Sequence, residues 1–437
     1  MRKIGFLSLL LVGAVAFLIG CGKTEQKKKD YVTYSEYTSV KLYHEIPALI
    51  TEHTKIGEAI DYGKGNYVLE IQGAKKEDYD HYVALLKEAG LKQYSDSGKE
   101  GFEGFVYSTT FQKGKMPVVV TYAKRLEKVY VMASKDLPLS EHLVYDETST
   151  KKNVGGAKTK IYFPQLDSHI GFSAIIQLKN GNFVIHDGGT GNDAKKLVDQ
   201  LEKLTPEGQK PVIEGWFLSH SHIDHVGALQ TIAIDKGLSS RICVEGIYFF
   251  TPSGRDFGEY EEYPNVKLLS YALKAFNNTE GMNTPVFRPQ FGQRYYFNDL
   301  VIDISVTMEM EPYASHEVVS YNDLSVYMMH YIDGQKFFTT GDGDHATQKT
   351  AMRVYEESYF DMEVYMVPHH AINVYNYFTD YCSIDTAIYP RNGVKSDTAP
   401  EENIYLVSKV KEAYSREDGI VVLTFPYTVG TAEILVE

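Results

Sequence analysis

The order of apolar and polar positions along the chain predicts two folded parts with a polar stretch between them. In the first part, apolar residues recur at helical spacing over residues 75–89, and Gly90 follows where a helix would end. Strand-like runs stand before and after this helix, at residues 67–71, 105–111, 117–123 and 128–133. This order predicts a small α+β accessory domain over residues 31–150.

The second part follows residues 146–160, which are polar, contain a Gly pair and predict a linker. A larger domain is expected over residues 155–437. Helical spacing returns at residues 195–204 and again from about Asp224. Strand-like runs occupy residues 173–178, 183–185, 216–218, 301–306, 324–331, 335–340 and 362–367.

Length and composition agree with this division. The 437 residues exceed the usual size of one domain. At 43% hydrophobic residues, the chain has enough apolar side chains to be globular rather than disordered. We therefore expect at least two domains.

Residues 1–20 have the pattern of a signal peptide. A basic start is followed by the apolar stretch Phe6–Ile19, which is too short to span a membrane comfortably. The stretch ends in L-I-G-C, which resembles the lipobox of bacterial lipoproteins. That resemblance implies cleavage before Cys21, a lipid on Cys21, a tether over residues 21–30, and an extracytoplasmic protein anchored to the bacterial cell membrane. An ordinary short signal or an uncleaved anchor is the alternative.

Two further cysteines remain, Cys243 and Cys382. They lack the C-x-x-C spacing of a metal site, and an oxidising compartment allows one disulfide between them. We expect both to be structural.

Four metal-ligand residue types are concentrated in Leu218–Gly227, which reads L-S-H-S-H-I-D-H-V-G. Residues two apart in an extended chain project to the same side, so His220 and His222 are expected to reach one ion. The turn into the following helix is expected to aim Asp224 and His225 at a second ion. Imidazole and carboxylate ligands suit Zn²⁺, with Mn²⁺ or iron as alternatives.

The H-x-H-x-D-H pattern resembles the signature of the metallo-β-lactamase-fold hydrolases. The similarity continues upstream in D-G-G at Asp187, and downstream in Asn322–Val326, T-G-D ending at Asp342, and P-H-H ending at His370. This set is most similar to the branch that holds the hydrolase domains of competence-type DNA-uptake channels and the teichoic-acid phosphorylcholine esterases. The resemblance implies an α/β fold of the αββα type, with two sheets packed together and helices outside.

The resemblance also implies roles for residues outside the signature. Asp187 is expected to orient the ligand imidazoles without binding a metal itself. Asp342 is expected to bridge two metal ions, and either His369 or His370 to complete the second metal site. Asp344 and His345 follow Asp342 so closely that the bridging position remains open to reassignment.

One part of the family pattern is missing. Many members place another histidine between the signature and T-G-D, and here Glu311 and His316 are the residues available in that region. Either of them replaces that histidine, or the first metal site has fewer protein ligands.

The expected activity is hydrolysis of a phosphodiester or a phosphorylcholine-type ester of the cell envelope. In this scheme two divalent ions, most simply Zn²⁺, share a bridging hydroxide that Asp224 orients and that attacks the substrate. One alternative is an extracellular nuclease of the DNA-uptake type. Another is a non-catalytic lipoprotein that binds a ligand in the same fold.

Charge counts against nucleic acid as a partner. Residues 1–150 hold 20 Lys+Arg and 20 Asp+Glu, and subtracting these from the totals of 44 and 58 leaves 24 and 38 for residues 151–437. The second part therefore carries the whole net charge of −14. A groove for a polyanion needs clustered basic residues, so a small-molecule or envelope ester is the expected substrate.

Overall fold

The computed structural model describes residues 46–63, 66–134, 137–150, 152–167, 170–250, 284–307, 321–372, 374–394 and 399–436. Cys21, the signal peptide, the tether, Glu311 and His316 lie outside the described residues, and the predictions about them stay predictions.

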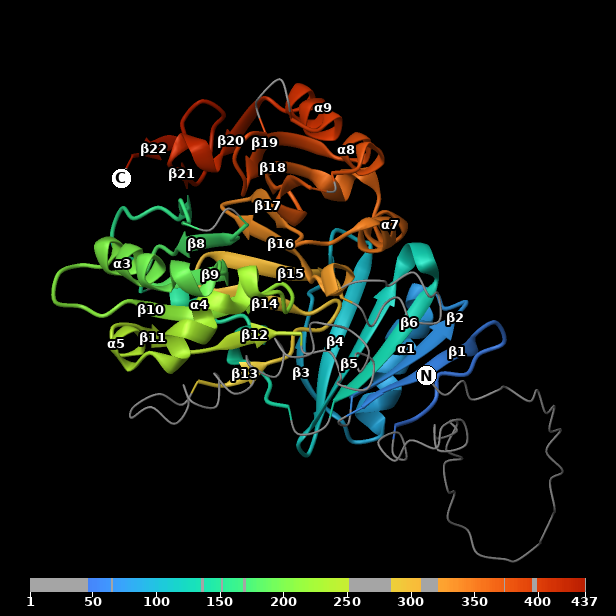
Figure 1. Cartoon of the computed structure of the whole chain (residues 1–437). Helices are drawn as coiled ribbons and strands as arrows, with labels where there is room; N and C mark the ends of the chain where they lie inside the picture. Colours follow the sequence, from blue (N-terminus) through green and yellow to red (C-terminus); the bar gives the residue numbers. More distant parts are fainter. Residues whose placement is uncertain are drawn as a thin grey trace, which may run out of the picture.

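Two sheets packed face to face form the larger part of the molecule (Figure 1). The first has nine strands in the order β13-β12-β10-β9-β8-β7-β21-β22, with β11 beside β10. Its strands are β7 (Lys160–Phe163), β8 (Ser173–Gln177), β9 (Phe183–Asp187), β10 (Val212–Leu218), β11 (Cys243–Val244), β12 (Ile247–Phe249), β13 (Val286–Phe287), β21 (Ile420–Thr424) and β22 (Glu433–Leu435).

The second sheet has seven strands in sequence order from β14 to β20. They are β14 (Arg294–Phe297), β15 (Leu300–Val306), β16 (Tyr327–Ile332), β17 (Gln335–Thr339), β18 (Asp361–Met366), β19 (Ser383–Tyr389) and β20 (Glu412–Ser415). Strands β17 to β20 run parallel, so their carboxyl ends meet at one edge of the sheet.

Alternation along each strand determines which side chains face which layer. In β8, Ala174 and Ile176 belong to the core between the two sheets, whereas Ile175 packs toward the helices on the outer face. Those helices are α3 (Ala194–Leu204), α4 (Ile223–Ile234) and α5 (Lys236–Ser239). Helices α7 (His345–Val354), α8 (Asn376–Tyr381) and α9 (Glu401–Lys409) cover the outer face of the second sheet. The predicted α/β class and αββα arrangement are confirmed.

A third sheet forms the amino-terminal unit. It has six antiparallel strands in the order β1-β2-β6-β5-β4-β3, and α1 (Lys76–Glu88) packs on one of its faces. The strands are β1 (Lys55–Gly63), β2 (Asn66–Gln72), β3 (Lys92–Asp96), β4 (Val106–Lys113), β5 (Met116–Ala123) and β6 (Lys128–Ser134). The short α2 (Glu147–Thr150) follows within the stretch predicted as a linker.

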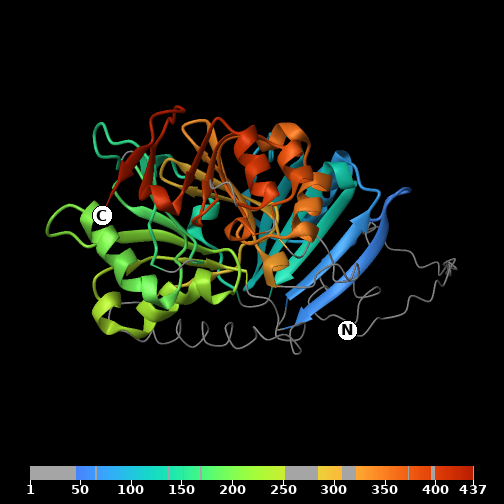
Figure 2. The same ribbon diagram turned by 45° about the horizontal axis from the view of Figure 1, so that its top comes forward.

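The amino-terminal sheet packs directly on the larger part of the molecule, as Figure 2 shows. Phe105 and Tyr130 of this unit share one hydrophobic cluster with Tyr355 and Tyr359 beside the second sheet. Arg294 of β14 joins the two units: its guanidinium donates to the carbonyls of Ser97 and Gly101 and forms a two-pronged ion pair with Asp303. The outer face of the second sheet is therefore covered partly by helices and partly by another sheet.

Predicted elements in the second part agree with the structure except at two boundaries, and the first of these is the strand expected from residue 216, which begins at Val212. The strand expected from residue 324 begins at Tyr327, because residues 321–324 form a 3-10 turn that continues into Ser325, whose N–H donates to the carbonyl of Asn322. In the first part, β1 and β3 were not predicted. Strand β3 has the sequence K-Q-Y-S-D, which carries no apolar alternation because it forms an edge of the sheet.

Cys243 and Cys382 are free thiols. Among the helices that the structure describes, none combines the length and the apolar character needed to cross a bilayer.

Candidate metal centre

The histidine-rich segment lies at a strand-to-helix junction. Strand β10 ends at Leu218, and α4 begins at Ile223 with His222 as the residue before its first turn. The N–H groups of His225 and Val226 both donate to the carbonyl of His222, which tightens the entry into the helix. Nε2 of His220 and Nδ1 of His222 lie 2.8 Å apart, so these two side chains converge as the i, i+2 spacing predicted.

Asp187 lies behind the histidines at the end of β9. Its carboxylate is 2.8 Å from Nδ1 of His225 and accepts hydrogen bonds from the N–H and Oγ of Ser219. Because the hydroxyl proton of Ser219 is used on Asp187, the Ser219 oxygen accepts from Nδ1 of His220 at 3.0 Å. Both contacts leave Nε2 of each histidine with its lone pair toward the centre. Orienting a ligand in this way is the role expected of Asp187 and Ser219 as outer partners of metal ligands.

Asp342 enters the centre from the second sheet. It follows β17 after the turn Thr340-Gly341, where Gly341 has a φ of +52°. Its N–H donates to Oγ of Ser325, which fixes the turn against the segment before β16. The Asp342 carboxylate lies 3.1 Å from Nε2 of His225 and 3.8 Å from Nε2 of His220.

The two histidines after β18 have different positions. Nε2 of His370 lies 2.8 Å from Asp224 and 3.1 Å from Asp342, whereas Nε2 of His369 lies 3.0 Å from the side-chain amide of Asn322. His369, His370 and Ala371 all have φ between 50° and 59°, a left-handed conformation that costs free energy in residues with a side chain. This turn points the two imidazoles to different partners and places His370 in the centre.

These residues form two groups that share Asp342. Ligand atoms of His220, His222 and Asp342 lie within 4.8 Å of one another, and so do those of Asp224, His225, Asp342 and His370. All of them are buried except His222, which is partly exposed. The sharing of one carboxylate by two groups is compatible with a pair of neighbouring ions.

Unsatisfied atoms at the centre fit this assignment. Nε2 of His225, Oδ1 of Asp342 and Nε2 of His370 are buried and lie at ion-pair distances from one another and from Asp224, but none of these contacts has the geometry of a hydrogen bond. A buried polar atom without a partner costs free energy, and native proteins rarely keep three together. A divalent cation held among them satisfies all three, and the mixture of imidazole and carboxylate matches Zn²⁺ or a related metal.

Charge at the centre is also consistent with a cation. Burial opposes ionisation of Asp342, but His225 and His370 lower the pKa of this carboxyl well below its usual range. Burial likewise opposes ionisation of Asp224, and His370 lowers the pKa of that carboxyl. Burial lowers the pKa of His220 well below the usual histidine value, so this ligand is neutral. Two carboxylates thus remain ionised in an enclosed site. Although burial lowers it, Asp342 and Asp187 raise the pKa of His225 well above its usual value, so a bound cation would take the place of a proton at this imidazole.

The other residues considered for the site lie at its edge. Asp344 begins α7, where its carboxylate accepts from the N–H of His345 and from the hydroxyl of Tyr375. His345 is exposed, and its Nδ1 lies 2.9 Å from the hydroxyl of Tyr377. Neither residue belongs to the two ligand groups found among the described residues.

Two contributors had no signal in the sequence. Ser219 links Asp187 to His220, and its place directly before the H-S-H run is the only hint of that role. Phe172 stacks on the His225 ring with centroids 5.3 Å apart, and its N–H donates to the carbonyl of Asp224. Phe172 comes from the start of β8, so its contact with the ligands depends on the tertiary fold.

Comparison with known proteins agrees with this site. Residues 167–289 match the family model described as Metallo-beta-lactamase superfamily. The matched range contains Asp187 and the strand-to-helix junction. Asp342 and His370 lie beyond it, so their assignment rests on the geometry above.

No curated protein matches the chain. Among 20 matching chains of solved structures is the metallo-beta-lactamase fold protein YhfI from Bacillus subtilis. It is 10% identical, the match covers 59% of this chain and 97% of that chain, and the TM-score is 0.37. A likeness at this level carries no argument about activity.

Proposed function

We propose that this protein is a metal-dependent hydrolase that cleaves an ester or phosphodiester bond with two divalent cations. The observation that carries the proposal is the pair of ligand groups joined by Asp342, whose buried nitrogen and oxygen atoms face one another without hydrogen-bond geometry. The superfamily match over residues 167–289 supports the same class of chemistry.

The side chains of this centre hold and orient reacting groups. When bound, two divalent cations supply Lewis acidity and lower the pKa of water toward neutrality. Asp187 and Ser219 keep His225 and His220 in the tautomers that present Nε2. Phe172 covers one face of the His225 ring and excludes water from that side.

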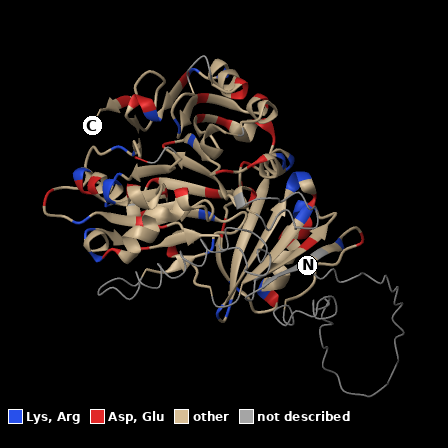
Figure 3. Ribbon diagram, in the orientation of Figure 1, with Lys and Arg blue, Asp and Glu red and all other residues tan. Residues whose placement is uncertain are grey.

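The substrate class we favour is a phosphodiester or a phosphorylcholine-type ester of the cell envelope. Each ion pair described at the centre joins a histidine to an aspartate. In the part of the chain that the structure describes, Figure 3 shows basic and acidic residues interspersed over the outer helices and loops. This distribution supports a small substrate over a nucleic acid.

The proposed location is outside the cytoplasm, with a lipid on Cys21 as the anchor. This part of the proposal rests on the lipobox-like sequence before Cys21.

Metal content and turnover of the purified full chain test the proposed activity. We expect close to two Zn²⁺ or Mn²⁺ per chain by elemental analysis, with hydrolysis of bis-p-nitrophenyl phosphate or p-nitrophenyl phosphorylcholine. His222→Ala should lose turnover, whereas Asp344→Asn, two residues beyond Asp342, should retain the metal and most activity. Metal binding without turnover on any ester would favour the non-catalytic binding protein instead.

A further inference from the structure

Three exposed isoleucines stand beside the metal centre. Ile223 lies between His222 and Asp224, Ile372 follows Ala371 after His370, and Ile170 precedes Gly171 and Phe172. Their exposed fractions are 43%, 49% and 49%. Only twelve large hydrophobic residues are exposed among the described residues, and three of these are at this one place.

Contacts at Asp224 bring the three segments together. The carbonyl of Asp224 accepts from the N–H of Phe172, and its carboxylate lies 2.8 Å from Nε2 of His370. The segments of Ile170 and Ile372 therefore both touch the residue that follows Ile223. Each of the three isoleucines is thus within two residues of a group that contacts Asp224 or of Asp224 itself, and we call the three together the isoleucine rim.

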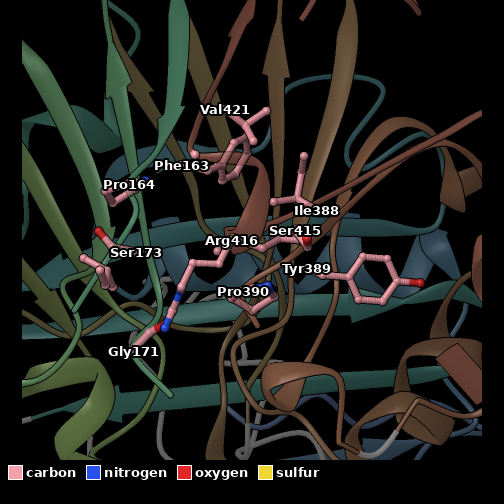
Figure 4. Close-up of a pocket in the computed structure, with 13 residues that line it drawn as sticks. Phe163, Pro164, Gly171, Ser173, Ile388, Tyr389, Pro390, Ser415, Arg416 and Val421 are labelled. Carbon is pink, nitrogen blue, oxygen red and sulfur yellow. The ribbon is translucent and has the colours of Figure 1, made fainter. Parts of the chain in front are cut away.

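A hydrogen bond from Arg416 holds the backbone next to Ile170. Arg416 donates from its guanidinium to the carbonyl of Gly171. Figure 4 shows this side chain extending toward Gly171 among the residues that line a pocket. The backbone beside Ile170 is thus fixed by a buried arginine, even though the Ile170 side chain faces solvent.

Single exposed apolar residues are ordinary in soluble proteins and need no function. A group of them beside buried candidate ligands differs, because it offers apolar surface next to the atoms that would hold the reacting part of a substrate. Apolar surface at the mouth of a polar centre is typical of ligand sites, in which a few polar groups orient the ligand and apolar contacts supply affinity.

We propose that the isoleucine rim binds an aliphatic substituent of the substrate, next to the ester group that the centre cleaves. The proposal rests on the proposed function and specifies its substrate: an ester or phosphodiester that carries an alkyl chain. Each methylene that loses its contact with water on the rim increases affinity, by about fourfold at full burial and by roughly twofold where one side stays exposed.

Alkyl p-nitrophenyl phosphates with chains of one to eight carbons test the proposal, because the reacting group and the leaving group stay constant. For the metal-loaded full chain, kcat/KM should rise by roughly twofold per methylene. Ile223→Asn and Ile372→Asn should flatten this rise, and Ile223→Leu should keep it.

Ile234→Asn is the matched control. Ile234 is the last residue of α4, is 67% exposed, and lies about 16 Å along the helix axis from Ile223. The same substitution there should leave the chain-length dependence of kcat/KM unchanged. Equal slopes in the wild type and in all variants, or no slope in the wild type, would overturn the proposal.

A binding experiment separates this proposal from the proposed hydrolase. Calorimetric titration with n-alkylphosphonates, whose C–P bond resists hydrolysis, should show the same chain-length dependence and the same loss in Ile223→Asn. If no ester is hydrolysed but binding still depends on chain length, the proposal about the isoleucine rim is supported and the proposed hydrolase activity is wrong. If a sedimentation experiment shows a dimer that Ile223→Asn dissociates, and chain length has no effect on binding, the rim is instead a contact between two copies.

Discussion

Among the described residues, two sets of buried histidines differ in how their nitrogen atoms are satisfied. His186 and His330 lie between the two sheets with Nε2 atoms 2.5 Å apart, and Nδ1 of His330 is 2.9 Å from the carbonyl of Phe337. At the candidate metal centre, by contrast, Nε2 of His225 and Nε2 of His370 face carboxylates at 2.8–3.1 Å without hydrogen-bond geometry. Burial alone therefore does not mark a metal ligand. A metal ligand is indicated instead where several histidine nitrogens that lack hydrogen bonds face the same carboxylates.

The two sets are neighbours in sequence at one point. His186 and Asp187 are consecutive in β9, and successive side chains of a strand face opposite sides. His186 stacks on Phe217 in the core between the sheets, whereas Asp187, with a φ of +50°, turns to Ser219 and His225. One residue serves packing and the next supports the metal centre.

The largest expected effect comes from Asp342→Ala, because both ligand groups contain this residue. We expect loss of both metal ions and a fall in turnover of about 1000-fold, which corresponds to about 4 kcal/mol of transition-state stabilisation. Elemental analysis and steady-state kinetics measure the two effects. Retention of two ions by the variant would contradict a shared ligand.

The adjacent pair His369 and His370 gives a sharper comparison. His370→Ala should weaken binding of the second ion by at least about 100-fold, more than loss of an outer partner usually does. His369→Ala should leave the number of bound ions unchanged, because its Nε2 contacts Asn322. Titration of each apoprotein with Zn²⁺ and a competing chelator measures this difference. If His369→Ala also removes an ion, the assignment of the ligand is wrong.

His330→Leu should affect stability and leave metal content unchanged. The substitution leaves Nε2 of the buried His186 without its partner, at a cost of about 1–3 kcal/mol in the free energy of unfolding. Urea denaturation of the zinc-loaded protein provides the measurement. The double variant His186→Leu/His330→Leu removes both partners and should be less destabilised than the sum of the two single variants.

An effect of similar size is a pH dependence of stability from the same pair. Burial lowers the pKa of His330 to about 3, and burial followed by repulsion from His330 lowers the pKa of His186 well below 6.5. The unfolded chain takes up protons below pH 6.5 while the folded pair stays neutral, so stability falls as the pH decreases from 6.5 toward 3. For His330 this loss is about 2 kcal/mol between pH 7 and pH 5.

The control for this pH effect is the His186→Leu/His330→Leu protein in the same buffers. Subtracting its pH profile removes the contribution of the metal ligands. An unchanged pH dependence in the double variant would show that the pair does not titrate on unfolding.

The sequence by itself determined the elements that depend on local pattern. Helical periodicity in residues 223–234 and the apolar run before Ser219 are local properties, so the strand-to-helix junction and the convergence of His220 with His222 were predictable. The spacing D-G-G, H-S-H-I-D-H and T-G-D pointed to Asp187 and Asp342 through family resemblance.

Only the tertiary structure decided which atoms meet across the two sheets. Whether His369 or His370 enters the centre depends on three left-handed residues after β18, which no local pattern predicts. The pairing of His186 with His330 and the hydrogen bond from Phe172 to Asp224 join residues from distant parts of the chain. Such contacts result from packing two sheets and their connecting loops around one core, so their geometry is a property of the whole fold.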